Sequence, residues 1–262
     1  SAARGPYAAA PFRQRLVAAR RAAVLNETTG SAATDEAGVF LRQVRSFVRR
    51  EGRMTDGQKR ALDELWPRYG VEPPATAFDL DALFGRAAPR IFEIGFGMGD
   101  YLHSRVLAEP EHDFFGVEVH RPGVGRLLNR VAAAGASNLR VASFDAVEVL
   151  RDWLPEACLD EIVIQFPDPW HKARHHKRRL VQPAFAQLAI SRLKPGGLWS
   201  LATDWQPYAE HMLDVLNAQA GLRNLSADGG YVPRPATRLK TKFEMRGERL
   251  GHAVFDLAYR RV

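Results

Sequence analysis

The stretch EIGFGMGD, residues 93–100, gives the clearest indication of the fold in this sequence. It follows a short apolar run rich in strand-forming residues, and a helical pattern begins near residue 98. Its glycines, Gly95, Gly97 and Gly99, occupy alternate positions. Without a Cβ, a backbone can turn sharply and lie against a ligand. The stretch therefore indicates a strand, a tight turn and a helix, the first unit of a Rossmann-like sheet.

The chain beyond this stretch repeats the same alternation of strand and helix. Strands are predicted at residues 90–95, 114–119, 139–144, 161–166 and 198–203, with helices near 98–108, 121–135, 146–154, 180–193 and 206–220. At the end of the chain, residues 222–227 and 252–262 are both strand-like with no helix between them, so they should pair antiparallel. The predicted fold class is α/β, a doubly wound, mostly parallel seven-stranded sheet with an antiparallel C-terminal strand.

The composition before residue 89 predicts two further segments. Residues 1–40 hold five Arg and no acid in their first 26 positions, followed by a Ser, Thr, Ala and Gly-rich linker, which favours a basic, disordered tail. Residues 41–88 form a helical lead-in, in which Thr55 caps a helix over 56–69 and Pro73–Pro74 stop it. The main domain is expected to span residues 89–262.

Charge and cysteine content narrow the partners and the compartment. The formal charge of +7 favours a polyanion, with nucleic acid first and an anionic membrane surface second. No run approaches the roughly 18 apolar residues of a spanning helix, so no membrane insertion is expected. Cys158 is the single cysteine, which favours a reducing cytoplasm and a role as a buried packing residue.

Acidic residues fall where the predicted strands end. Glu93 lies in the first strand, Glu118 closes the second, and Asp145 and Asp168 follow the third and the fourth. In an open α/β sheet the ligand lies beyond the carboxyl ends of the strands, where these acids would converge. Carboxylates repel the pyrophosphate of a dinucleotide and attract a cationic nucleoside without phosphates. S-adenosylmethionine, with its sulfonium and ammonium groups, is such a molecule.

The main alternative is an NAD(P)-dependent oxidoreductase of Rossmann type. The glycine turn and Glu118 suggest it, although the spacing G-x-G-x-G departs from the dinucleotide pattern G-x-G-x-x-G. Taken singly, each acid is equally well explained as a solvated loop residue or a helix N-cap. Binding of NADH in place of S-adenosylhomocysteine would favour the alternative.

The stretch QFPDPWHKARHHKRRL, residues 165–180, places an acid beside a basic segment. Pro167 and Pro169 restrain the backbone on both sides of Asp168 and so restrict where its carboxylate points. Residues 172–179 contain seven basic or imidazole side chains in eight positions, which suits phosphate contacts. The histidines lack acid or cysteine partners at ligand spacing, so no metal site is expected.

The stretches EIGFGMGD, GVEVHRPG, FDAVEVL, FPDPWHKARHHKRRL, LATDWQPYAEHML and TKFEMRGERLGH, in this order, closely resemble the tRNA (guanine-N7)-methyltransferase family. The resemblance runs from about Val44 to the C-terminus. It implies a Rossmann-like class I methyltransferase that uses S-adenosyl-L-methionine to methylate a guanine in the tRNA variable loop, at tRNA position 46.

The resemblance also implies roles for individual residues. Asp168 would be catalytic and would face the cofactor. The cofactor-binding set is Glu93, Gly95, Gly97, Glu118, Asp145 and Asp168. The substrate-binding set is Lys172, Asp204, Thr241, Lys242, Phe243 and Glu244. The RNA-interaction set is Arg174, His175, His176, Lys177, Arg178 and Arg179.

The partners expected on this basis are tRNA alone, with no membrane and no metal. The protein would act in the cytoplasm as a monomer or homodimer without an obligate partner. A third interpretation is an RNA-binding protein that kept the fold and lost the chemistry. The acid at position 168 argues against that interpretation, and a turnover assay separates the two.

Overall fold

The computed structural model describes residues 53–236, 238 and 253–262, and its centre is one seven-stranded sheet. The strand order is β3-β2-β1-β4-β5-β7-β6. The strands are β1 (Arg90–Ile94), β2 (Asp113–Val117), β3 (Leu139–Ala142), β4 (Leu159–Gln165), β5 (Leu193–Thr203), β6 (Leu222–Asn224) and β7 (Phe255–Arg261). β1 to β5 are parallel, and β7 runs antiparallel between β5 and β6. The predicted fold class is confirmed.

Helices connect the parallel strands, as predicted, but several differ in extent from the prediction. They are α5 (Asp100–Ala108), α6 (Arg121–Ala133), α7 (Ala146–Glu148), α8 (Pro183–Arg192) and α9 (Gln206–Asn217). The helix expected over 146–154 is only one α-helical turn, continued by a π-helical segment, η1 (Val149–Trp153). A 3₁₀ helix, η2 (Ala173–Arg178), forms within the basic segment and was not predicted. None of the helices in the described part of the chain is long and apolar enough to cross a bilayer.

In its described residues, 53–88, the lead-in forms three short helices, α2 (Asp56–Glu64), α3 (Trp66–Tyr69) and α4 (Leu80–Phe84). Thr55 caps α2 in a capping box with Gln58, as predicted. The single helix expected over 56–69 is wrong, because it breaks at Leu65, just before Pro67. Proline has no N–H to donate to the preceding turn, and its ring crowds the carbonyl four residues earlier.

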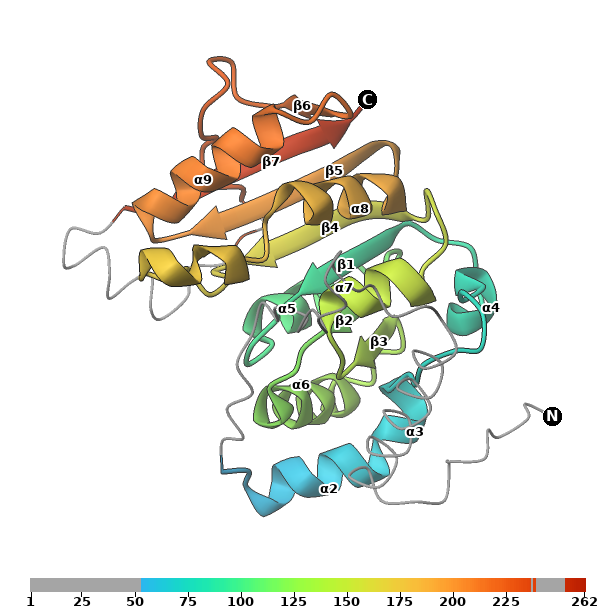
Figure 1. The fold of residues 1–262 in the computed structure, drawn as a ribbon. Helices are drawn as coiled ribbons and strands as arrows, with labels where there is room; N and C mark the ends of the chain where they lie inside the picture. The colour runs from blue at the N-terminus through green and yellow to red at the C-terminus, as the bar shows by residue number, and fades with distance from the viewer. Residues whose placement is uncertain (1–52, 237, 239–252) are drawn as a thin grey trace, which may run out of the picture.

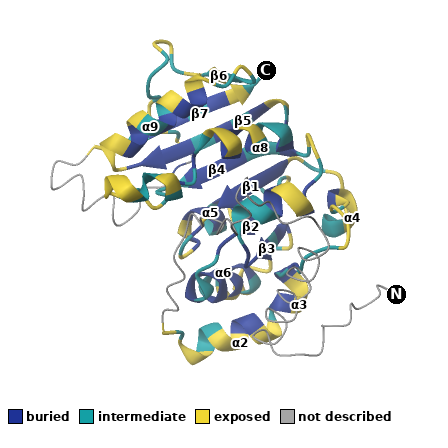
Figure 2. Ribbon diagram, viewed as in Figure 1, coloured by how far each residue is buried: buried dark blue, intermediate teal, exposed yellow. Residues whose placement is uncertain are grey.

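The lead-in shares the hydrophobic core of the main sheet (Figure 2). Trp66 and Tyr69 are buried, and the N–H of Val71 donates to Val141 O of β3 at 2.9 Å. α2 also lies against α6, where Gln58 Nε2 donates to Pro122 O at 3.1 Å. Cys158 packs against this core, as predicted, but it is half-buried and not buried.

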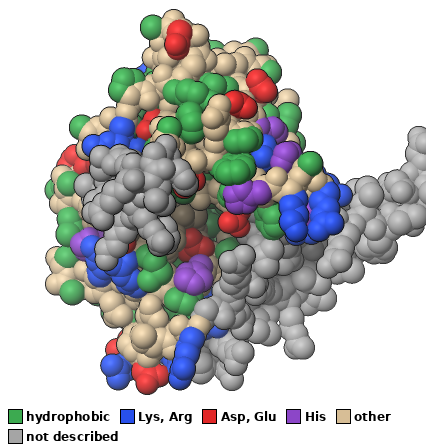
Figure 3. Space-filling model, turned by 90° about the vertical axis from the view of Figure 1, so that its left-hand side faces the viewer, with side chains coloured by type: hydrophobic (Ala, Val, Ile, Leu, Met, Phe, Trp, Pro, Cys, Tyr) green, Lys and Arg blue, Asp and Glu red, His purple; other side chains and the backbone are tan. Residues whose placement is uncertain are grey.

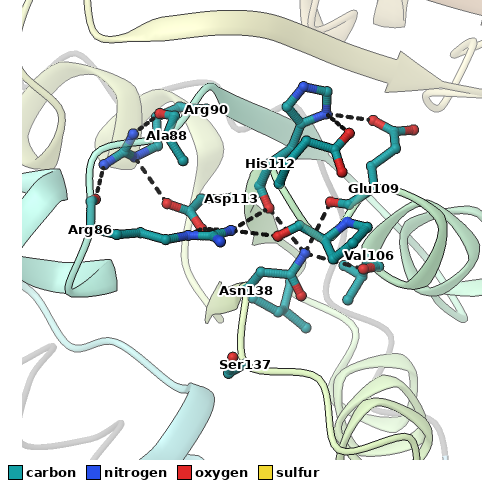
Figure 4. A network of polar contacts seen from close by, with 12 residues as sticks. Arg86, Ala88, Arg90, Val106, Glu109, His112, Asp113, Ser137 and Asn138 are labelled. Carbon is teal, nitrogen blue, oxygen red and sulfur yellow. Dashed lines mark hydrogen bonds and ion pairs between the residues drawn. The ribbon is translucent and has the colours of Figure 1, made fainter.

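Polar groups tie together the amino ends of the central strands (Figure 4). The carboxylate of Asp113, at the start of β2, is buried and accepts from Arg86 Nε at 2.9 Å. Asn138 Nδ2 donates to three main-chain carbonyls, those of Val106, Glu109 and His112. These contacts hold the amino ends of the strands together. The opposite edge, where the arrowheads of β1, β4 and β5 point in Figure 1, carries those predicted site residues that the structure describes.

Candidate active site

The glycine turn after β1 is strongly bent and lies beside open space. Gly95, Gly97 and Gly99 have φ of 73°, 56° and 73°, the left-handed region in which a Cβ is strained. A Cβ added to Gly95 or Gly97 would meet no atom within 4 Å. One added to Gly99 would lie 2.9 Å from Leu127 of α6. The first two glycines therefore leave room for a ligand against the backbone, whereas the third permits helix packing.

A fourth glycine, which the sequence did not single out, supports this turn. Gly123 lies in the first turn of α6, and a Cβ there would be 1.8 Å from the carbonyl oxygen of Gly97. Only glycine allows α6 to approach the turn this closely. The signal was present in GVEVHRPG, but the distance between helix and turn cannot be read from a sequence.

Glu118, directly after β2, is hydrogen-bonded to the glycine turn. Its two carboxylate oxygens accept from the backbone N–H of Gly97 and of His120, each at 2.7 Å. Burial raises the pKa of Glu118, while these backbone donors act in the opposite direction. Carboxylate oxygens have further lone pairs, so the same group can accept from ribose hydroxyls.

Glu93 lies inside β1 and is only 3% exposed. Burial raises the pKa of its carboxyl to about 8; Arg105 opposes this shift, and Glu161 and Glu118 add to it. The group is therefore mostly protonated at neutral pH. A cation bound nearby would favour the ionised form of Glu93, so this carboxyl suits a ligand with a sulfonium or ammonium group. Asp145, shortly after β3, caps α7 by accepting from the N–H of Val147 at 2.9 Å.

Asp168 lies in a strained turn at the end of β4. Phe166 and Trp170, on either side of the Pro167–Pro169 stretch, have φ of 50° and 48°. Ala157 is the one other described residue that is not glycine and has positive φ. Each such conformation costs about 1–3 kcal/mol. The Asp168 side chain is exposed, and the N–H of Phe166 is anchored by Ala202 O of β5 at 2.8 Å.

The segment after β5 meets the Asp168 turn through aromatic rings. Asp204 is exposed just beyond β5. The ring of its neighbour Trp205 packs edge to face against the ring of His171, with 4.3 Å between the ring centroids. The structure thus joins the loops after β4 and β5. Trp205 and His171 were not among the predicted site residues. They are far apart in the sequence, and no sequence pattern indicates that their rings are in contact.

The basic segment mostly faces solvent around η2. Lys172, Arg174 and Lys177 are exposed, and His175 and His176 are half-buried. The guanidinium of Arg178 lies over the Trp170 ring, 5.0 Å from its centroid, whereas Arg179 is only 4% exposed. Figure 3 looks onto this face and shows Asp and Glu side chains near its middle, with Lys and Arg side chains on both sides.

Four predicted substrate contacts, Thr241, Lys242, Phe243 and Glu244, lie outside the described residues. Just before them, Arg238 is buried and makes a two-point ion pair with Asp256 of β7, at 2.7 and 2.9 Å. Its guanidinium also lies over the ring of Phe166, 5.8 Å from the centroid. Arg238 was not predicted, because an isolated arginine in a loop gives no signal of burial. Within the described ranges, no three His, Cys, Asp or Glu side chains cluster in a way that could hold a metal.

Comparison with known proteins agrees with this geometry. Residues 87–257 match a family model described as "Putative methyltransferase". The chain is 56% identical over 231 residues to a tRNA (guanine-N(7)-)-methyltransferase of Stutzerimonas stutzeri, covering 88% of this chain and 97% of that one. A namesake from Ectopseudomonas mendocina is 59% identical, with 86% and 95% covered. This chain belongs to the tRNA (guanine-N7)-methyltransferase family.

Solved structures share the fold with this family member at low sequence identity. The 16S rRNA methyltransferase KamB aligns with a TM-score of 0.54 and 15% identity, covering 74% of this chain and 98% of that one. A 16S rRNA (adenine(1408)-N(1))-methyltransferase variant from Catenulisporales acidiphilia aligns with a TM-score of 0.50 and 18% identity, covering 72% and 96%. The family membership removes the oxidoreductase alternative.

Proposed function

We propose that this protein transfers a methyl group from S-adenosylmethionine to N7 of a guanine in the tRNA variable loop, at tRNA position 46, giving N7-methylguanosine. The observation that carries the proposal is the acid of the family motif, Asp168, held in a strained turn at the same sheet edge as the glycine turn. Strain of this kind persists where the surrounding structure holds it in place, and it gathers at functional sites.

The cofactor would lie against Gly95 and Gly97, where the open space admits it. S-adenosylmethionine supplies an electrophilic methyl group when bound. Glu118 would accept from its ribose hydroxyls, Glu93 would face its positive charge, and Asp145 would contact its base. Asp168 would close the site from the β4 side.

The side chains of this protein would position the substrates and stabilise charge, and no general base is required. N7 of guanine carries an in-plane lone pair that is free even in a paired base, so no proton has to leave before attack. As the bond to N7 forms and the bond to sulfur breaks, positive charge moves onto the purine. Asp168 would stabilise that charge or accept from the guanine edge. Asp204 and Glu244 would accept hydrogen bonds from the N–H donors of the same guanine edge. Lys172 would contact a phosphate or the guanine O6.

The exposed cations of the basic segment would bind tRNA phosphates without reading bases. Thr241, Lys242 and Phe243 would complete the substrate contacts, as in the family motif. The same proposal has the protein act in the cytoplasm on tRNA, as a monomer or homodimer without an obligate partner. No step in it uses a metal.

The decisive experiment is incubation of the protein with unmodified tRNA transcript and methyl-labelled S-adenosylmethionine, followed by digestion and mass spectrometry of the nucleosides. We expect label in N7-methylguanosine, and none when the variable-loop guanine is replaced by adenosine. Label on another nucleoside, or none with S-adenosylhomocysteine still bound, would refute the proposed reaction.

Asp168→Asn tests the catalytic acid in the same assay. We expect turnover to fall by about 100-fold or more with nearly unchanged tRNA binding, because the substitution keeps shape and removes charge. Asp152→Asn removes an exposed carboxylate that pairs with Arg151 on η1, and it should leave turnover unchanged. Wild-type turnover in Asp168→Asn would contradict the assignment.

A further inference from the structure

Arg179 is the last cation of the basic segment and the only one of them whose side chain is buried, at 4% exposed. The backbone at the end of η2 explains the difference. Arg179 is the C-cap of η2, with φ of −56° and ψ of 135°, and its N–H donates to His176 O at 3.0 Å. The chain therefore leaves the helix at Arg179, whose side chain packs inward, whereas Arg174 and Lys177 within η2 face solvent.

The guanidinium of Arg179 donates to three separate parts of the site. Nε donates to Pro169 O at 3.0 Å, one residue after Asp168. Nη1 donates to Pro207 O at 3.2 Å, in the first turn of α9 after Asp204. Nη2 donates to His176 Nε2 at 3.1 Å. One side chain therefore links the turn after β4, the loop after β5 and η2.

This charge is buried at a sheet edge without a carboxylate partner among the residues the structure describes. Its acceptors are two main-chain carbonyls and an imidazole nitrogen, and its plane lies over Tyr208, 4.9 Å from the ring centroid. Burial raises the pKa of Tyr208 to about 12, so the ring carries no charge to compensate it. Desolvating a cation without a counter-ion is unfavourable, whereas the fork of five donors suits acceptors on several segments.

We propose that Arg179 is a positioning residue, which holds the strained Asp168 turn against the loop after β5 and does not bind RNA. The proposal rests on the proposed methyl transfer and replaces the phosphate contact that the family resemblance implied for this position. A turn with two left-handed residues needs such an external tie, because its own backbone preferences oppose its shape. Arg179 supplies the tie at Pro169, the residue next to the acid.

The test compares Arg179→Met, Arg179→Lys and Arg178→Ala with the wild-type protein. For Arg179→Met we expect the single-turnover rate at saturating tRNA to fall about 10- to 100-fold, since a small displacement of a reacting group has such effects. The dissociation constants for tRNA and S-adenosylhomocysteine should stay within twofold of wild type. Arg179→Lys keeps the charge but cannot reach all three acceptors, so it should restore little of the rate. Arg178→Ala should instead weaken tRNA binding.

A second readout does not use activity. Amide hydrogen exchange should accelerate in residues 166–172 of Arg179→Met and stay unchanged in α5 and α6. Weakened tRNA binding with a smaller salt dependence and an unchanged rate would overturn the proposal and make Arg179 an RNA contact. A wild-type rate in either Arg179 variant would also overturn it. If Arg179→Met fails to fold, Arg179→Lys carries the test, with thermal unfolding as the check. Absence of activity in the wild type would refute the methyl transfer alone, because hydrogen exchange still reports on the tie.

Discussion

Glu93 shows at the scale of one residue how the site differs from a solvated cluster of acids. Its carboxyl is buried within β1, and its pKa of about 8 means that the folded protein keeps the proton at neutral pH. The unfolded chain releases that proton near pH 4.5, the ordinary value. Between these two values the unfolded state binds fewer protons, so stability falls as the pH rises.

We therefore expect Glu93→Gln to become progressively more stable than wild type between about pH 5 and pH 8. Gln has the same shape and cannot ionise, so the substitution removes the burial penalty that wild type meets over this range. The difference should reach a few kcal/mol and level off above about pH 8. Denaturant unfolding of both cofactor-free proteins across this range measures it. A difference that does not vary with pH would show that Glu93 is not the titrating group.

The position of Glu93 was predictable, but its charge state was not. The strand pattern places an acid just before the glycine turn, which is enough to propose a cofactor contact. Its pKa depends on Arg105 of α5 and on Glu161 of β4, which come from elsewhere in the chain. The neutral form follows from burial among these residues, and a sequence does not report distances between elements.

At the scale of elements, the approach of α6 to the glycine turn makes the strongest prediction. Gly123→Ala would place a Cβ against the Gly97 carbonyl and push the turn away from α6. We expect it to lower the free energy of unfolding by about 1–3 kcal/mol and to weaken S-adenosylhomocysteine binding. Chemical denaturation and isothermal titration calorimetry measure the two effects.

Gly57→Ala is the matched control, because it makes the same change in the first turn of a helix where an added Cβ has room. Gly57 lies in the first turn of α2, and a Cβ there would meet only Thr55 Oγ1 at 4.0 Å. Alanine favours helix over glycine by up to about 1 kcal/mol, so stability should stay the same or rise. Unchanged ligand affinity in Gly123→Ala would mean that the turn does not form the cofactor surface.

Helices long enough to show a hydrophobic period were predicted well, and short ones were not. α6 and α9 lie within a few residues of their predicted bounds because each follows a clear helix period. α4 and η2 span too few residues to show a period, so neither was predicted. Missing η2 had a consequence for the site, since a run of basic residues does not show that the chain leaves a helix at Arg179 and buries that side chain while Arg174 and Lys177 stay exposed.

At the scale of the whole molecule, the two ends of the parallel strands have different roles. The amino ends of the strands are held together by internal polar contacts such as Arg86–Asp113. The carboxyl ends carry the glycine turn, the acids and the basic segment. This division follows from parallel connectivity, which brings the loops after successive strands to one edge, and so it was predictable from the order of strands and helices. The net charge of +7 gave the class of partner but not the face that binds it.

The salt dependence of tRNA binding separates local contacts from net charge. Arg174→Ala with Lys177→Ala removes two exposed cations from η2, and Arg223→Ala with Arg260→Ala removes two exposed cations from β6 and β7. Arg260 lies near the end of β7, which runs antiparallel to β5, and it donates to Gly196 O, so the control lies toward the opposite edge of the sheet.

Each phosphate contact contributes about 0.7–0.9 to the slope of log affinity against log salt concentration. The η2 double variant should therefore have a slope shallower by about 1.5 and a weaker affinity at low salt, whereas the control should keep the wild-type slope. Filter binding or fluorescence anisotropy over a range of salt concentrations measures both. Equal flattening in the two double variants would show that tRNA responds to the overall field of the protein, and an unchanged slope in both would place its phosphates elsewhere. Because both variants lose the same charge, a difference between them can come only from where that charge lay.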